Sequence, residues 1–416
     1  MAYSSDVLIV GAGAGGLSLG LRLGSKGHRV RILQEQGPGL LAHRPELVQP
    51  AGLQDYAELG LLERLKARNV ARVEQFHFHR IGGEPLCQVD YRALDHPYPY
   101  ALVTLPRQTR RVLLEGLHTC PTVHVHWGTR LTGVLRRSGS AQVIGATATE
   151  GGRERDFYAR VTIGADGSWS CLRDMLGLVC RTKRYRNAFL GLRAKRPKGL
   201  AGEWGGRVHY YLGHGEILGY FPVSPVACCL LFMVPAGDLA AIDGPRLAAL
   251  KHRIRTIDPG LGDALGEAAP WEQFSRLFPV QIRTATWVAD GAALLGDAAH
   301  ACHPHVAQGS SQAMEDGRVL TDVLEGCFER GDFTARALAP YERIRRPMVE
   351  RLQRVADEYA WLWETSNPVL TRLRDRIFLN IGKRPALLHR VAATEAGLEP
   401  RPLTFVERLR ALGLCA

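Results

Sequence analysis

The sequence predicts an α/β fold: a parallel sheet buried on both faces, a second strand-rich domain inserted into it, and helices that complete the C-terminus. Three observations lead to this prediction. A strand–turn–helix–strand pattern opens the chain, buried strand segments return near residues 161 and 292, and a helical pattern runs from Pro340 to the end.

The start of the chain forms a βαβ pattern. Residues 7–10 are a short, continuously apolar run, which is typical of a strand buried on both faces of a parallel sheet. A glycine-rich turn covers residues 11–16, leucines follow at helical spacing until Gly27, and residues 29–33 read as a second strand. We therefore predict one half of a Rossmann-like, nucleotide-binding domain.

Further along, the pattern alternates between this domain and a second one. Short β-like segments rich in aromatics fill residues 73–106, a helix follows at 107–117, and strands dominate from about 184 to 287. A buried strand at 292–296 then leads into a helix near 311–320. The domains are predicted as follows: nucleotide-binding domain, 1–75, 100–182 and 286–340; β-sheet domain, 76–99 and 183–285; helical region, 341–416.

The C-terminal region carries an amphipathic helix. Its apolar residues share one face and its arginines lie off that face: Leu370, Leu373, Ile377 and Ile381 against Arg372, Arg374 and Arg376. Packing on the protein body is the main interpretation, and peripheral contact with a lipid surface is the alternative. No segment reaches the ~18 apolar residues of a membrane span.

Composition narrows the class of protein. The chain has 416 residues, 46% of them hydrophobic, and a net charge of +12 that is spread along the chain without a nucleic-acid recognition motif, so nucleic-acid binding is not expected. Nine cysteines form no CxxC pair, which favours reduced thiols. With Asp6 where an export signal needs basic residues, we predict a cytoplasmic protein.

The first motif that carries chemistry is GAGAGG at residues 11–16. Gly11 permits a tight turn, Gly13 lets the backbone approach a pyrophosphate, and Gly16 lets the helix pack on the strand, with Ala14 and Gly15 between them at the helix N-terminus. An acidic residue at the end of the second strand should bind the ribose. That place falls on Gln34, with Glu35 directly after it, and we favour Glu35.

Two later motifs carry a family resemblance. Residues 164–173 read GADGSWSCLR, with Asp166 in third place, and residues 294–316 contain LGDAAHACHP, AQG and AMED. Both resemble the single-component (class A) flavin monooxygenases, the family of para-hydroxybenzoate hydroxylase and the ubiquinone-biosynthesis hydroxylases. The resemblance covers roughly residues 5–345. It implies that family's fold and one non-covalent FAD in the first domain.

The resemblance also implies roles for residues of the third motif. Gly296 and Asp297 would bind the cofactor, the carboxylate accepting hydrogen bonds from ribityl hydroxyls, and Pro304 would form a rigid turn against the ring. A helix N-terminus would then face the flavin pyrimidine. The segment that leads from Pro304 into this helix departs from the family at two positions: Ala307, where the family commonly has Gly, and Ser311, where it commonly has Asn. The remaining cofactor residues implied are Gln308, Gly309, Ser310, Arg44 and Arg107. A solvated arginine is an equal interpretation of either arginine.

The family's reaction sets the functional expectation. NAD(P)H reduces the flavin, O2 forms a C4a-hydroperoxide on it, and a hydroxyl passes to a small aromatic or quinone- or quinolone-like molecule, here in secondary metabolism. His303 and His305 flank Pro304 and are the candidate bases, although either can instead bond backbone or water. The pocket candidates are His79, Tyr100, His209, Tyr211 and Phe221, with His77 and Tyr98 beside them.

Other functions remain open at this stage. A flavin-dependent halogenase is disfavoured because Trp361-Leu362-Trp363 is not followed by the WxWxIP pattern. A flavin-dependent saturase shares the fold but uses no oxygen, and a non-catalytic scaffold like the GDP-dissociation inhibitors would not need Asp166 and Asp297. We expect no metal, a small-molecule substrate, and a monomer or homodimer.

Overall fold

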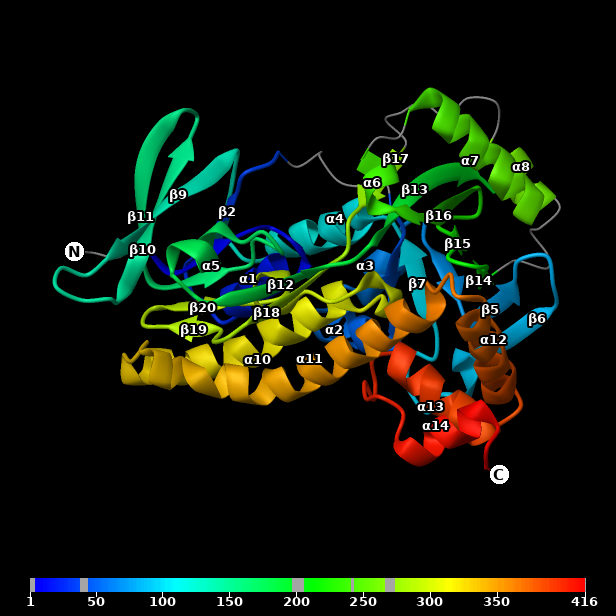
Figure 1. The fold of residues 1–416 in the computed structure, drawn as a ribbon. Coiled ribbons are helices and arrows are strands. Elements are labelled where there is room, and N and C mark those ends of the chain that lie inside the picture. The colour runs from blue at the N-terminus through cyan, green and yellow to red at the C-terminus, as the bar shows by residue number, and fades with distance from the viewer. Residues whose placement is uncertain (1–3, 38–43, 197–205, 241–242, 266–273, 416) are drawn as a thin grey trace.

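The computed structural model describes residues 4–37, 44–196, 206–240, 243–265 and 274–415 (Figure 1). Its first sheet has the strand order β19-β20-β11-β1-β2-β8, with the β9–β10 hairpin extending β11. The strands β20, β11, β1, β2 and β8 run parallel, as the buried apolar runs predict. Its strands are β1 Ser5–Val10, β2 Val30–Gln34, β8 Val123–Trp127, β9 Thr129–Arg136, β10 Val143–Glu150, β11 Arg153–Gly164, β19 Val288–Ala289 and β20 Ala292–Leu294.

A second sheet of seven strands lies beside the first, in the order β17-β13-β16-β15-β14-β5-β6. It joins distant segments, because β5 pairs in parallel with β14. Its strands are β5 Gln75–Arg80, β6 Pro85–Asp90, β13 Asn187–Lys195, β14 Arg207–Leu212, β15 Ile217–Pro222, β16 Ala227–Pro235 and β17 Phe274–Leu277. Two small sheets complete the strands: β3 Glu46–Val48, β7 Ala101–Thr104 and β4 Ala71–Val73; and β12 Cys180–Arg184 with β18 Val280–Thr284.

Helices cover the outer face of the second sheet, in a segment that the sequence pattern predicts as strand-dominated. Asp243 caps α7 by accepting from the Arg246 amide, and Leu247, Leu250 and Ile254 bury one helical face against the sheet. The prediction that strands dominate residues 184–287 missed these helices, because their helical spacing of apolar residues lies within an otherwise β-rich stretch. The helices are α6 Ala236–Ala240, α7 Gly244–Ile257 and α8 Pro259–Ala264.

The first sheet is packed by α1 Ala14–Ser25, α4 Pro106–Leu117 and the long α10 Gly309–Arg330, and α11 Ala335–Trp363 runs beside α10 (Figure 1). The remaining helices here are α2 Pro50–Glu58, α3 Leu62–Lys66, α5 Cys171–Met175 and α9 Asp297–His300, with 3-10 turns at Tyr91–Ala93 and Pro304–Val306. The architecture confirms the predicted fold class. The exact domain limits stay a prediction.

The C-terminal helices are α12 Pro368–Gly382, α13 Pro385–Glu395 and α14 Phe405–Leu412. The amphipathic prediction for α12 was wrong at Arg374. This side chain is fully buried, where its guanidinium donates to Asp375 and to the carbonyls of Gly213 and Trp363. The apolar residues Phe378 and Ile381 pack in the core below the second sheet. Among the described residues, no helix is long and apolar enough to cross a membrane.

Candidate functional site

A cavity of about 1110 Å³ lies between the two sheets. Its volume lies slightly above the usual range of small-molecule sites, ~300–1,000 Å³. One end is polar and is lined by the glycine turn after β1, the end of β2 and the start of α10. The other end is apolar and is lined by the inner face of the second sheet. The side chains of that face are Phe189, Tyr210, Ile217, Phe221, Leu231 and Leu277.

The glycine turn has the geometry of a phosphate-binding loop. An added Cβ on Gly13 would meet nothing within 4 Å, so the backbone there faces open space in the cavity. Helix α1 begins directly after it, with no side chain capping its first amides. Gly11 has a φ of 109°, and an added Cβ on Gly16 would lie 2.0 Å from the Gly11 carbonyl oxygen. Gly13, Ala14 and Gly15 therefore line the cavity. Gly16 lies outside the lining and allows the close packing of α1 against the turn.

The end of β2 separates the two candidate ribose contacts. The Gln34 Oε1 accepts a hydrogen bond of 2.8 Å from the Ala12 amide, so this oxygen already closes the glycine turn. Glu35 is exposed and lines the cavity. Its carboxylate is the group at this strand end that remains available to sugar hydroxyls.

Two carboxylates from the later motifs, Asp166 and Asp297, line the cavity. Asp166 is largely buried, and burial raises the pKa of its carboxyl group. Its Oδ2 accepts from the Leu172 amide, whereas its buried Oδ1 has no hydrogen-bond partner among the described residues. Asp297 is exposed in the cavity and accepts from Ser168 Oγ at 3.2 Å.

The loop before α10 brings a second helix N-terminus to the cavity. Ala307, Gln308, Gly309 and Ser310 line it, and the N-cap residue of α10, Gln308, makes no side-chain capping bond. Ala307 adopts a left-handed conformation with a φ of 48°. Ser311 points elsewhere, since its Oγ packs against Gly52 of α2.

Gln308 is partly committed to the C-terminal helices. Its Nε2 donates to the carbonyls of Thr394 and Glu395 at 2.8 and 3.2 Å. This loop is therefore held from both sides, by α10 and by α13.

Only one of the two arginines predicted to bind the cofactor lies at the cavity. Arg44 lines the cavity, whereas Arg107 is exposed and lies outside its lining. Arg110, one helical turn further along α4, lines it instead. Its guanidinium stacks on Trp127 at 4.9 Å, burial lowers its pKa, and Nε and Nη2 have no hydrogen-bond partner among the described residues. The i+3 spacing from Arg107 was the signal that could have found it.

At the junction of the polar and apolar ends, His303, Pro304 and His305 form a turn. A single oxygen, Glu364 Oε1, lies 3.0 Å from His303 Nε2 and 2.9 Å from His305 Nε2. Asn187 donates to the other oxygen of Glu364 at 3.0 Å. Nothing in the motifs marked Glu364, because it follows a different helix, α11.

The protonation states at this turn follow from burial and charge. Burial, and next the neighbouring His305, lower the pKa of His303 to about 4. Burial opposes ionisation of Glu364, but its contacts with the two imidazoles hold the pKa of this carboxyl well below its usual range. At neutral pH the turn therefore combines a neutral His303 with a carboxylate.

Most of the predicted pocket side chains lie elsewhere. His79, His209 and Tyr211 point to the outer face of the second sheet, and Tyr100 packs in the core beneath Arg72. Of the five candidates, only Phe221 lines the cavity. Because side chains alternate along a strand, Tyr210 rather than Tyr211 faces inward.

These features fit FAD. Two helix N-termini without a side-chain cap favour a pyrophosphate, as does the buried guanidinium of Arg110, whose Nε and Nη2 have no hydrogen-bond partner in the described part of the chain. Glu35 and Asp297 offer acceptors to hydroxyl groups. The open backbone at Gly13 leaves room for the ligand's close approach.

Comparisons with known proteins agree with this fit. A family model described as "FAD binding domain" matches residues 4–356. The chain is 27% identical over 409 residues to 6-methylpretetramide 4-monooxygenase of Streptomyces rimosus, covering 97% of this chain and 96% of that protein. It is 29% identical over 366 residues to 2-heptyl-3-hydroxy-4(1H)-quinolone synthase of Mycobacteroides abscessus, covering 84% and 88%.

A solved structure matches as well. P. aeruginosa PqsL in complex with 2-aminobenzoylacetate superposes with a TM-score of 0.75 at 25% identity, covering 86% of this chain and 96% of that one.

Proposed function

We propose a substrate class for this chain, which belongs to the FAD binding domain family and is a FAD-dependent monooxygenase of the kind that uses NAD(P)H and O2. The proposed substrate is a small aromatic, quinone- or quinolone-like molecule of secondary metabolism. One observation carries the proposal: the apolar end of the cavity, built from aromatic and aliphatic side chains, directly adjoins the His303–Pro304–His305 turn. A ring-bearing substrate is supported by the quinolone in the name of one relative and by the 2-aminobenzoylacetate in the complex of the similar solved structure.

The proposed cofactor contacts follow from the cavity. When bound, FAD supplies the redox chemistry that takes electrons from NAD(P)H and activates O2. The amides of α1 and Arg110 would bind its pyrophosphate, and Glu35 would accept from the adenosine ribose. Asp297 would accept from the ribityl hydroxyls, and the N-terminus of α10 would stabilise negative charge on the ring.

The proposed catalytic base is His305. It lies in the cavity lining, and the carboxylate of Glu364 orients its imidazole and would stabilise the imidazolium after proton uptake. A hydroxyl proton removed from the substrate makes its ring more electron-rich and so more reactive toward an electrophilic oxygen. The fully buried His303 positions Glu364 from the other side.

Turnover measurements test the substrate class. The purified FAD-loaded protein is mixed with NADH or NADPH and a panel of bicyclic phenols, quinolones and apolar alkenes, with O2 uptake and product mass recorded. A ring compound that gains one oxygen, with O2 uptake matched to NAD(P)H oxidation, is the expected result. Oxygen transfer to alkenes alone would contradict the aromatic substrate, and substrate reduction without O2 uptake would support the saturase alternative.

Variants at the turn test the base. His305→Gln should lower kcat by about 10²–10⁴-fold, and Glu364→Gln should lower kcat and displace the acidic limb of the pH profile. His124→Gln, on an exposed position of β8, is the control. Equal kcat in His305→Gln and the control would remove His305 from the proposal, without affecting the substrate class.

A further inference from the structure

Three histidines gather on the outer face of the second sheet, outside the cavity. Among the described residues, two groups of His, Cys, Asp or Glu place their ligand atoms within 4.8 Å of one another: His77, His79 and His209, and the His303–His305–Glu364 group. In the second group Glu364 already contacts both imidazoles, and His303 is fully buried. The first group has no part in the proposed oxygenation.

Strand geometry brings the first group together. His77 and His79 are two residues apart on β5, so their side chains leave the same face of the sheet. β14 runs parallel to β5 with His209 aligned to His77. The neighbouring positions Phe76, Phe78 and Val208 point to the opposite face and into the core. The backbone therefore places all three imidazoles on one face of the sheet, on the neighbouring strands β5 and β14 (Figure 1 labels both strands).

The spacing of the rings suits metal coordination. His79 Nε2 and His209 Nδ1 are 3.0 Å apart, and the His77 and His209 ring centroids are 5.0 Å apart. Two imidazole nitrogens on one tetrahedral Zn²⁺ are ~3.3 Å apart, given Zn–N bonds of ~2.0–2.1 Å. Small rotations about the side-chain bonds would therefore bring all three nitrogens to one ion.

The surroundings supply the other requirements of a site. His77 and His79 are partly exposed, so an ion and its water ligand can reach them, whereas His209 is buried at the base. Tyr211 stacks on His79 at 5.2 Å and donates to Asp258 at 2.8 Å, which places a carboxylate behind the cluster.

In contrast to the sequence-based expectation of no metal, we propose that His77, His79 and His209 bind one divalent transition-metal ion, of the Zn²⁺ type, with water at the open position. The ion would join β5 to β14, segments separated by 130 residues, and so would stabilise the second sheet from the side opposite the cavity.

Metal titration of the tag-free, FAD-loaded protein tests this site. After chelator treatment, Zn²⁺ affinity is measured by competition with a chromophoric chelator, and Co²⁺ is followed by its ligand-field bands at wavelengths beyond flavin absorption. We expect one ion per chain, and at least about tenfold weaker binding in His79→Gln and His209→Gln. Zn²⁺ should also raise the Tm of the wild type and leave that of His79→Gln unchanged.

Two controls make the outcome decisive. His305→Gln should bind Zn²⁺ like the wild type, and flavin content with far-UV circular dichroism verifies that each variant is folded. His77→Gln serves as a second ligand variant should His209→Gln fold poorly. The proposal is overturned by the absence of stoichiometric binding, which would leave the 3.0 Å contact as a plain imidazole hydrogen bond, or by binding that depends on His305 and not on His79.

Discussion

Single residues of the glycine turn have separable roles. Gly13 borders open cavity, whereas an added Cβ on Gly16 collides with backbone of the same turn. The motif predicts this division, with Gly13 at the approach of a pyrophosphate and Gly16 in the packing of the helix on the strand.

This difference yields a first prediction. Gly13→Ala should weaken FAD binding while the unfolding free energy of the FAD-free protein stays nearly unchanged, because the methyl group enters empty space. Gly16→Ala should destabilise the FAD-free protein by about 2 kcal/mol or more, since backbone has to shift. Flavin titration and urea unfolding of both variants distinguish the effects. Equal loss of stability in the two would show that Gly13 is also a packing residue.

Ala307 is the one non-glycine among the described residues with a positive φ, 48°. A left-handed conformation costs an L-residue with a Cβ ~1–2 kcal/mol, and glycine avoids that cost. Ala307→Gly should therefore raise the unfolding free energy by up to about 1 kcal/mol, measured by urea unfolding of the FAD-loaded protein. Ala337→Gly, within helix α11, is the opposite control and should lower it by about 1 kcal/mol. A decrease in both would mean that strain at Ala307 is negligible.

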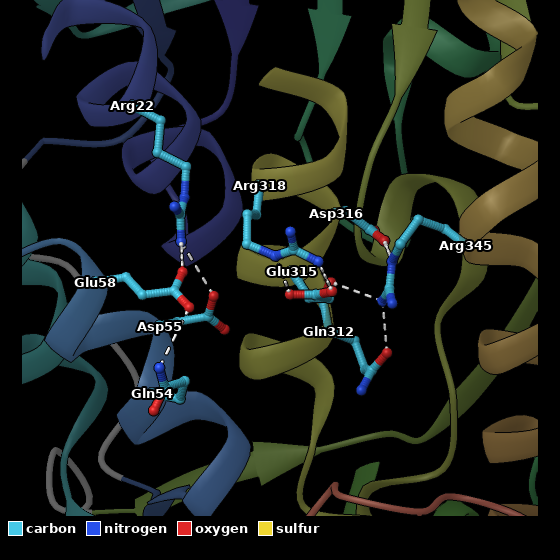
Figure 2. A network of polar contacts seen from close by, with 9 residues as sticks. All are labelled: Arg22, Gln54, Asp55, Glu58, Gln312, Glu315, Asp316, Arg318 and Arg345. Carbon is cyan, nitrogen blue, oxygen red and sulfur yellow. Dashed lines mark hydrogen bonds and ion pairs between the residues drawn. The ribbon is translucent and has the colours of Figure 1, made fainter. Parts of the chain in front are cut away.

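At the scale of elements, a polar network locks the helices that carry the motifs (Figure 2). The buried Asp316 of α10 accepts from the Gly296 amide at 2.8 Å and contacts His300 at 2.6 Å and Arg345 of α11 at 2.7 Å. The end of the third motif thus fixes the strand end that presents Asp297. Asp316 is fully buried and lies outside the cavity lining, so its role is to position the motif.

The same network contains an unusual carboxyl group, Asp55 of α2, which contacts Arg22 of α1 at 3.2 Å (Figure 2). Burial, and next the charge of Glu315, raise the pKa of Asp55 from 3.8 to about 7, and Arg22 only partly opposes this. Between these values the unfolded chain releases the proton while the folded protein retains it. Asp55 therefore favours folding at acidic pH and loses this contribution as pH rises toward about 7.

Thermal unfolding across pH tests the prediction. The Tm of Asp55→Asn relative to wild type should increase from pH ~4 to pH ~7 and then level off, because Asn cannot ionise. Glu63→Gln, on the exposed surface of α3, removes a charge outside the network and is the control. A Tm difference that is the same at every pH would mean that Asp55 is ionised throughout.

At the scale of the whole molecule, the cavity exists because the second sheet turns one face toward the first. Phe221 on β15 lies on this inner face, and Tyr211 on the neighbouring β14 lies on the outer one. We predict that Phe221→Leu raises KM for the substrate several-fold with little change in FAD affinity. Tyr211→Phe should leave both unchanged. Steady-state kinetics with the substrate from the turnover panel check this, and a KM effect in Tyr211→Phe alone would reverse the assignment of faces.

Sequence patterns predicted the fold class and most of the polar end of the site, since motif residues act through local backbone: Gly13, Asp297 and the start of α10 all border the cavity. They failed where a side chain's direction depends on packing. Arg107 and Arg110 share one helix, and only the docking of α4 decides which of them faces inward. Helices α6–α8 were missed because their apolar period lies between strong strand signals.

The amino-acid sequence alone determined that this chain forms a βαβ-based flavin site, because turn, strand and helix N-terminus are contiguous in the chain and need no distant partner. Only the tertiary structure decided which residues share a surface. Glu364 reaches His305 from another helix, and His79 meets His209 across 130 residues on the face opposite the cavity. The physical reason is that strand alternation and register assign each side chain to a face, and both are set by long-range pairing.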